Sequence, residues 1–306
     1  MIPPAAPLSA DLEPARDVAA RFVHDGSLPC LVFGVTDGAG RSDIVALGSE
    51  HQEVGPDSVF FIASVTKAIV ATALMQYVDE GRLGLRTPLA HYLPDCAAPV
   101  CESVSAWHLL THTSGLPDMS IDRLRNERPT YAHMLEYTLS SEPRWEPGSR
   151  YEYNSSAWVL LSEVMARLSN MPFPEVLQRR LTGPLGMEDT VFDARSRRSR
   201  IVSMNGVNAT NRIVEEILLW FLARATMPGG GMFGTAADLL RFGRALLLPR
   251  QGDAGDSVAR VLSTAAVAQM AEDQTVGIPA IAEDGSVYYV EQGLGWRKAG
   301  GDWPSG

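Results

Sequence analysis

A hydroxyl and an amine lie three residues apart in the segment FIASVTK, at Ser64 and Lys67. The segment passes from an apolar, strand-like run into AIVATALMQYVDEG, where apolar residues recur at helical spacing. Residues three apart share one face of a helix, so the Lys67 amine can approach the Ser64 oxygen. Ser64 is therefore either a nucleophile with Lys67 as its base, or an ordinary helix N-cap beside a solvated lysine.

The surroundings of the pair favour the catalytic interpretation. At the first turn of a helix, free backbone N–H groups and the positive end of the helix dipole surround a hydroxyl. The flanking residues are apolar: Phe60, Phe61, Ile62, Ile69 and Val70. Apolar surroundings disfavour an ammonium ion and leave a basic amine available near neutral pH. The S-x-x-K match alone is weak, since about one occurs by chance in a chain of this length.

Strand-like segments lie near both ends of the chain, and helical segments lie between them. Short β-rich runs are predicted at residues 31–36, 42–47, 59–63, 286–290 and 294–298, the first two joined at an Asp37-Gly38 turn. Helical spacing predicts helices at residues 12–23, 65–80, 107–110, 131–139, 156–168 and 236–248. Residues 191–211 are rich in arginine and are predicted to be a solvated loop.

This order predicts an α/β fold of the α+β type, with an antiparallel sheet built from both chain ends and a helical insertion. A doubly wound fold is disfavoured because the early strands join by hairpins. We expect a discontinuous sheet domain at residues 1–83 and 228–306 and a mainly helical domain at residues 84–227.

The composition is that of a globular protein, with 45% hydrophobic and 20% charged residues among 306. The net charge of -10 gives no basic footprint for nucleic acid or an anionic membrane. No apolar run of about 18 residues and no leader-like start is evident, so the sequence is interpreted as cytoplasmic. Cys96 and Cys101 could form a bridge, but three cysteines make no disulfide framework, and reduced thiols are favoured.

Five segments together resemble one known family. They are FIASVTK at 61–67, LLTHTSGLP at 109–117, WEPGSRYEYNSSAWVLL at 145–161, PGGGMFGTAADLLRF at 228–242 and QGLGW at 292–296. In this order they resemble the serine hydrolases that include class C β-lactamases, DD-peptidases and family VIII carboxylesterases. The resemblance runs from about residue 31 to residue 296, and it implies the β-lactamase/DD-peptidase-like fold.

The resemblance also implies catalytic roles. Ser64 would be the acylated nucleophile and Lys67 its base partner. The family's second motif is Tyr-x-Asn, whose tyrosine shuttles a proton between nucleophile and leaving group. Aligning YNSSAWVLL with this motif makes Tyr153 the shuttle.

The same alignment puts Ser155 where asparagine usually stands. A serine donates one hydrogen bond and loses the second donor and the reach of the amide, which weakly favours an esterase over a β-lactamase. A register error would instead select Tyr151 and Asn154. We expect Ser155, Asn154, Trp145 and Gly230 to bind substrate, although a large aromatic is more often a core residue.

The family's third motif, a Lys/His-Thr/Ser-Gly strand, is not evident. Lys298-Ala299-Gly300 matches K-x-G formally but directly continues the predicted strand at Trp296. That strand would supply one of two oxyanion donors, worth about 2.7–4 kcal/mol in the transition state. We expect the motif beyond Gly306; otherwise another chain completes the sheet or the chain is catalytically impaired.

No cofactor and no metal are predicted. His108 and His112 have the i, i+4 spacing of zinc-binding helices, but no Glu follows His108 and no third ligand is evident. The resemblance places His112 in a turn that orders a loop. The triple glycine at 229–231 lacks the G-K-[ST] ending of a phosphate loop and indicates a tight turn near the site.

The sequence is interpreted as a serine hydrolase that forms a covalent acyl-enzyme on a small ester or amide, with a carboxylesterase as the leading activity. Alternatives of the same fold are a D-amino-acid peptidase or β-lactamase and an acyltransferase. An alternative of another class is a non-catalytic binding module that lacks the third motif.

Overall fold

The computed structural model describes residues 12–37, 41–50, 52–94, 96, 98–203, 209–247 and 261–298, without the side chains of residues 209–215. The chain forms two compact units, and each is described by itself. Unit 1 comprises Met1–Ile62, Thr182–Ala223 and Met232–Arg260, and unit 2 comprises Ala63–Leu181, Arg224–Gly231 and Val261–Gly306. The domain boundaries expected from the sequence, at residues 83, 227 and 228, stay a prediction.

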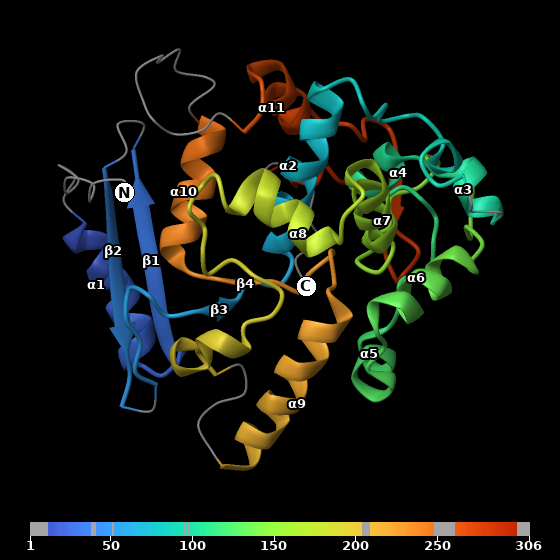
Figure 1. The fold of residues 1–306 in the computed structure, drawn as a ribbon. Coiled ribbons are helices and arrows are strands. Elements are labelled where there is room, and N and C mark those ends of the chain that lie inside the picture. The colour runs from blue at the N-terminus through green and yellow to red at the C-terminus, as the bar shows by residue number, and fades with distance from the viewer. Residues whose placement is uncertain are drawn as a thin grey trace. The chain divides into compact units, whose positions relative to one another are not determined.

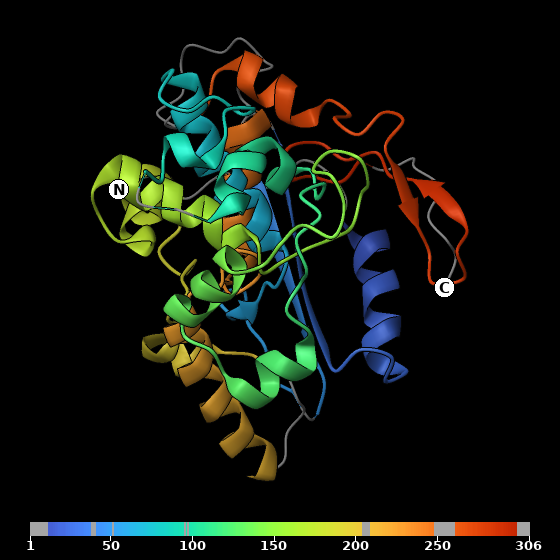
Figure 2. The ribbon, with the colours of Figure 1, turned by 90° about the vertical axis from the view of Figure 1, so that its right-hand side faces the viewer.

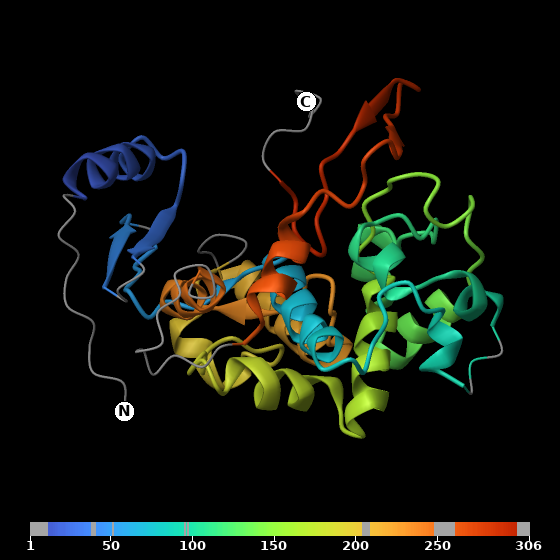
Figure 3. The ribbon, with the colours of Figure 1, turned by 90° about the horizontal axis from the view of Figure 1, so that it is seen from above.

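Unit 1 is built around an antiparallel hairpin of β1 (Cys30–Thr36) and β2 (Ser42–Gly48). Helices α1 (Glu13–His24) and α10 (Ala236–Leu247) pack on this hairpin, and Figures 1 and 3 show them on its opposite faces. Gly34 leaves room for the Leu240 side chain of α10, which would have to shift to accommodate a Cβ there. The predicted hairpin is confirmed, although part of its expected Asp37-Gly38 turn lies outside the described residues.

Two further strand pairs complete the described β-structure. In unit 1, β3 (Phe60–Phe61) pairs with β4 (Phe233–Gly234), and in unit 2, β5 (Pro279–Ile281) pairs with β6 (Val287–Tyr289). The registers place Cys30 opposite Gly48, Phe60 opposite Gly234 and Ala280 opposite Tyr288. The described strands thus form three small antiparallel sheets, in a fold that is otherwise rich in helices. They do not form the single sheet from both chain ends that the sequence predicts.

Unit 2 is mainly helical. Its helices are α2 (Val65–Asp79), α3 (Pro99–Ser103), α4 (Ala106–Leu110), α5 (Ile121–Glu127), α6 (Tyr131–Leu139), α7 (Trp158–Ser169), α8 (Phe173–Leu177) and α11 (Thr264–Ala271). Short turns of other helix types occur at Leu89–His91 and Gln178–Thr182. The helices expected at residues 65–80, 107–110, 131–139 and 156–168 are confirmed to within two residues at each end.

Helix α2 is the core of unit 2, because it is buried along almost its whole length. It contacts α7 and α11, and Figure 3 shows it (cyan) beside α11 (orange-red). α7 is likewise buried over its first turns, through Trp158, Leu160 and Leu161. An apolar helix that is covered on all sides holds its first turn in a fixed place, and that turn carries Ser64 and Lys67.

The basic segment expected to be a loop is more ordered than its composition indicates. Arg195–Arg200 forms a 3-10 turn, in which the guanidinium groups of Arg197 and Arg200 both bind the carboxylate of Asp189. A helix that the sequence did not predict, α9 (Ala209–Ala225), follows it. Among the described residues no helix, α9 included, has both the length and the apolar content needed to cross a lipid bilayer.

The segment at residues 294–298 was predicted to be a strand and is instead a tight turn. Gly295 has a φ of 78°, which lies in the left-handed region, and an isolated bridge joins Gln292 to Arg297. A Cβ on Gly295 would collide with Ala71 of α2. The glycine is therefore required for conformation and for close packing, which a strand pattern does not reveal.

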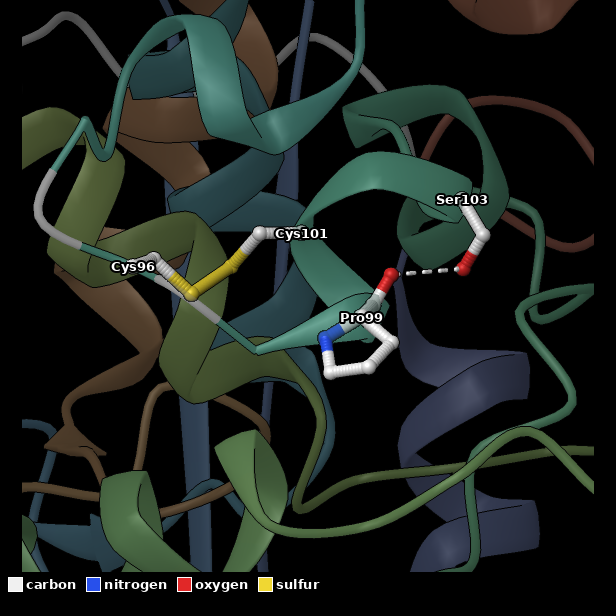
Figure 4. The surroundings of a disulfide bond; sticks show 4 residues. All are labelled: Cys96, Pro99, Cys101 and Ser103. Carbon is white, nitrogen blue, oxygen red and sulfur yellow. Dashed lines mark hydrogen bonds between the residues drawn. A yellow bond between two sulfur atoms is a disulfide. The ribbon is translucent and has the colours of Figure 1, made fainter.

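A disulfide joins Cys96 and Cys101 (Figure 4), so the prediction of reduced thiols is wrong for this pair. The chain turns into α3 at Pro99, and this turn brings the two Cα atoms to 6.4 Å, an ordinary spacing for a disulfide. The spacing in the sequence left both outcomes open, because only the backbone path decides whether the thiols meet. Cys30 is a free, buried thiol, and its burial raises its pKa.

Candidate active site

Ser64 lies at the first turn of α2, with its hydroxyl available for chemistry. It occupies the N-cap position, but its side chain makes no capping hydrogen bond. Ala63, the residue before it, has a φ of 44°, in the left-handed region that residues other than glycine rarely adopt. Strained backbone of this kind concentrates at functional sites, where surrounding packing holds it in place.

Lys67 lies one turn further along α2, and only 3% of it is exposed. Its Nζ is 3.5 Å from the Ser64 Oγ, donates to the Ser155 Oγ at 2.9 Å, and donates to the carbonyl oxygen of Gly229. It also lies 4.6 Å from the centre of the Tyr153 ring. Burial lowers the pKa of Lys67 below its usual value of 10.5, because an ammonium ion is poorly solvated there.

These partners orient the amine. A neutral amine has two hydrogens and one lone pair, and Gly229 and Ser155 offer acceptors for both hydrogens. The Ser64 Oγ is the third acceptor near the amine, so a Lys67 that has lost one proton would turn its lone pair toward the Ser64 hydroxyl. The separation of 3.5 Å is long for a hydrogen bond, but catalytic contacts are often loose before substrate binds.

Tyr153 completes the set of groups around the Ser64 hydroxyl. Its hydroxyl donates to the Ser64 Oγ at 2.7 Å, and the residue is 46% exposed. Its ring lies 4.4 Å from the ring of His112, at an angle of 33°. The phenol thus contacts both the nucleophile and the open side of the site, as a proton shuttle would have to do.

Asp118 fixes the turn that follows Tyr153. Its carboxylate accepts hydrogen bonds from the backbone N–H groups of Ser155 and Ser156, at 3.1 and 2.8 Å, and from the Ser156 hydroxyl. These donors lie just ahead of α7, where helix N–H groups have no partner in the helix. A carboxylate from a distant loop therefore holds Ser155 where Lys67 can reach it.

Asn154 has a different place from the one the sequence suggested. It is buried, its amide donates to the Leu116 carbonyl at 2.7 Å, and its oxygen accepts from the Ala157 N–H at 2.8 Å. Both ends of the side chain are thus used inside the protein. We assign Asn154 to positioning the turn and not to substrate binding.

The glycine loop at 229–231 packs against the nucleophile and the turn. A Cβ on Gly229 would overlap the backbone of Ser155, and a Cβ on Gly230 would lie 3.7 Å from the backbone of Ala63. Gly229 supplies the carbonyl that binds Lys67, so its missing side chain permits that contact. Gly230 lies close to the Ser64 backbone, and Gly229 makes the polar contact with Lys67; substrate binding by Gly230 stays a prediction.

His112 is a buried, neutral histidine beside the site. Its Nδ1 accepts a hydrogen bond from the Asn154 N–H at 3.2 Å, which places the ring proton on Nε2. Burial, together with the nearby charge of Lys67, lowers the pKa of His112 to about 3. The Nδ1 of His108, its partner in the i, i+4 pair, accepts from the Ser105 N–H at the start of α4. Within the described residues no group of three or more metal-ligating side chains is present.

A cavity of about 410 Å³ opens on this cluster within unit 2. Its lining comes from α2, from the segment around Tyr153, from the β5–β6 hairpin (red in Figure 2) and from the turn after it. The lining residues are Ser64, Lys67, His112, Arg150, Tyr151, Glu152, Tyr153, Ile281, Tyr288, Gln292, Gly295 and Arg297. Trp145 is not among them. The cavity combines a serine hydroxyl, a buried amine, an apolar wall and two guanidinium groups.

Sequence reasoning identified Ser64, Lys67, Tyr153 and Ser155, and the structure brings these four together. It did not identify the roles of Asp118 or Gly229. Gly229 lies inside a recognised motif and Asp118 directly follows one, but hydrogen bonds between distant loops leave no local pattern.

The formal K-x-G match has no contact with the nucleophile among the described residues. Lys298 approaches Glu291, with 3.9 Å between the charged groups, and its backbone N–H donates to the Glu291 carbonyl. Ala299 and Gly300 lie outside the described residues.

Comparison with known proteins assigns the chain to a single family. A family model described as "Beta-lactamase" matches residues 15–305. The D-alanyl-D-alanine-carboxypeptidase/endopeptidase AmpH of Escherichia coli is 28% identical over 195 residues, which are 61% of this chain and 48% of AmpH. Esterase EstB of Burkholderia gladioli is 29% identical over 279 residues, which are 78% of this chain and 69% of EstB.

Solved structures agree on the fold. The D-amino acid amidase of Ochrobactrum anthropi SV3 superposes with a TM-score of 0.72 at 22% identity, over 94% of this chain and 80% of the amidase. The chain spans about half the length of AmpH.

Proposed function

Since the chain belongs to the Beta-lactamase family of serine hydrolases, we propose that it hydrolyses small carboxylic esters through an acyl-enzyme on Ser64. The observation that carries the proposal is the buried Lys67 amine, whose Nζ contacts the Ser155 Oγ, the Gly229 carbonyl and, at 3.5 Å, the Ser64 Oγ. When the amine loses the proton that faces Ser64, its lone pair can accept the proton of the Ser64 hydroxyl. A nucleophilic serine needs such a base within reach and in its neutral form.

The proposed reaction has two halves. Ser64 Oγ attacks the ester carbonyl, and its proton passes to Lys67. The tetrahedral intermediate collapses with loss of the alcohol, which takes a proton delivered through Tyr153. Water then attacks the acyl-enzyme with the same groups acting in reverse, and the acid is released.

An ester is favoured over an amide for a reason that lies in the site. Ser155 stands where the family has asparagine, and its hydroxyl already accepts a hydrogen bond from Lys67. It keeps at most one hydrogen for a substrate, whereas an amide side chain would offer two. A substrate amide therefore loses a recognition element that an ester does not need. The likeness to EstB agrees with this preference, whereas AmpH supports a D-alanyl peptidase as the second candidate.

Intact-mass spectrometry combined with turnover tests the proposal. We expect a fluorophosphonate adduct that is absent from Ser64→Ala, together with turnover of p-nitrophenyl acetate. Slow or no turnover of a penicillin is expected in parallel. Absence of both adduct and turnover would refute the enzyme, and faster turnover of a penicillin or a D-alanyl peptide than of the ester would replace the esterase.

A further inference from the structure

The cavity at Ser64 is lined by more positive charge than the composition of the chain indicates. Two guanidinium groups, those of Arg150 and Arg297, line it together with the Lys67 amine and one carboxylate, Glu152. Glu152 is engaged by Arg144, whose Nη2 lies 2.7 Å from its Oε2. A chain with a net charge of -10 thus has a basic cavity.

Arg150 lines the cavity without a counter-charge among the described residues. In the described part of the chain it forms no ion pair, and its Nε is buried without a hydrogen-bond partner. A buried donor of this kind is costly unless something else satisfies it, and a charged one is more costly still. In native structures a buried donor without a hydrogen-bond partner needs an explanation, and one explanation is a ligand that accepts its hydrogen bond.

Trp145 holds Arg150 in place. The Arg150 guanidinium lies 4.4 Å from the centre of the Trp145 ring, within the range of a cation–π contact, and Arg150 lines the cavity. Trp145 therefore acts on the cavity through Arg150, although it does not line the cavity itself. A guanidinium fixed in this way is suited to bind a carboxylate through two parallel hydrogen bonds.

The wall beside these charges is apolar and aromatic. Tyr151 is bridged to Ala280 of β5, and both belong to a buried cluster against which Tyr288 packs. Burial raises the pKa of Tyr151 to about 12, so this phenol stays neutral at physiological pH and contributes no opposing charge. A ring bearing a carboxylate matches a wall of this kind next to a guanidinium.

We propose that Arg150 determines specificity for substrates that carry a carboxylate on an aromatic or apolar group, bound in the same cavity as the ester. This inference rests on the proposed esterase activity. Arg150 would bind the carboxylate while Ser64 attacks the ester carbonyl. Binding energy gained away from the reacting bond positions that bond for attack.

A pair of matched substrates tests the proposal: 4-acetoxybenzoate and its neutral analogue 4-acetoxybenzamide. We expect the wild-type kcat/KM ratio of acid to amide to fall about 10- to 100-fold in Arg150→Gln, the effect of losing a hydrogen bond between charged groups. Arg150→Lys should retain part of the preference. Arg125→Gln, which removes one positive charge from the exposed surface of α5, is the matched control and should keep the wild-type ratio.

Binding is measured separately from turnover by titrating both compounds into Ser64→Ala, with and without Arg150→Gln. We expect tighter binding of the acid, and loss of that preference when Arg150 is replaced. An unchanged ratio and unchanged binding in the Arg150 variants would overturn this inference and leave the esterase standing. Charge-selective binding without any hydrolysis by the wild type would overturn the esterase alone.

Discussion

Replacing Lys67 with methionine tests the central element of the site. Methionine keeps most of the volume of the side chain and removes the amine that faces Ser64. General-base catalysis contributes about 10²- to 10⁴-fold, so kcat/KM for p-nitrophenyl acetate should fall by that factor. The acid limb of the wild-type pH–rate profile should lie below pH 10.5, because burial lowers the pKa of this amine, and the Lys67→Met variant should lack it.

The same substitution has a second, independent consequence for stability. The folded pKa of Lys67 is lower than the unfolded one, so between these two values the unfolded wild type binds one proton more than the folded protein does. In this window wild-type stability rises with pH relative to Lys67→Met, by up to about 1.4 kcal/mol per pH unit. Above pH 10.5 the difference is constant, and it is also constant below the folded pKa.

Urea unfolding of both proteins between pH 7 and 10, followed by circular dichroism, measures this difference. The unfolding free energy of the wild type should begin to rise with pH at the folded pKa of Lys67. The acid limb of kcat/KM should have its inflection at the same pH, because both report protonation of the Lys67 amine. A loss of activity below 10-fold in Lys67→Met, or an acid limb that persists in it, would refute Lys67 as the base. A stability difference that does not change with pH would refute the lowered pKa.

Three further predictions concern groups around this pair. Tyr153→Phe removes the hydroxyl that donates to Ser64 but keeps the ring. Ester turnover should fall about 10²-fold or more while the fold is unchanged. A decrease of less than 10-fold would exclude Tyr153 as a proton shuttle. Gly229→Ala places a methyl group against the Ser155 backbone, so both activity and stability should fall, by about 1–3 kcal/mol for the latter in urea unfolding. Gly243→Ala, in α10 with open space around it, is the control and should stabilise by up to about 1 kcal/mol; equal stability changes in the two variants would contradict the steric argument. The folded pKa of His112 is about 3, below its unfolded value near 6.5, so unfolding free energy should fall as pH drops from 6.5 toward 3. In His112→Asn the decrease of the unfolding free energy with falling pH should be smaller by up to about 1.4 kcal/mol per pH unit. Parallel curves of unfolding free energy against pH for the two proteins would show that His112 does not cause the decrease.

The sequence by itself determined the chemical type of this protein. The S-x-x-K pair at Ser64 is local, because three residues of helix place both side chains on one face whatever the rest of the chain does. The ordered motifs predicted the family, which the comparisons confirm, and proposed Tyr153 as a site residue, since each motif is a short segment that can be recognised without any distant contact. Most helices followed in the same way from periodicity along the chain.

The tertiary structure decided what completes the site and how it is tuned. The carboxylate of Asp118 and the carbonyl of Gly229 act across loops far apart in the chain, and the lowered pKa of Lys67 comes from burial. The position of Arg150 in the cavity, where it contacts the Trp145 ring, likewise depends on packing. Hydrogen bonds between loops, desolvation and charge balance are properties of neighbours in space, so no reading of neighbours along the chain could have supplied them.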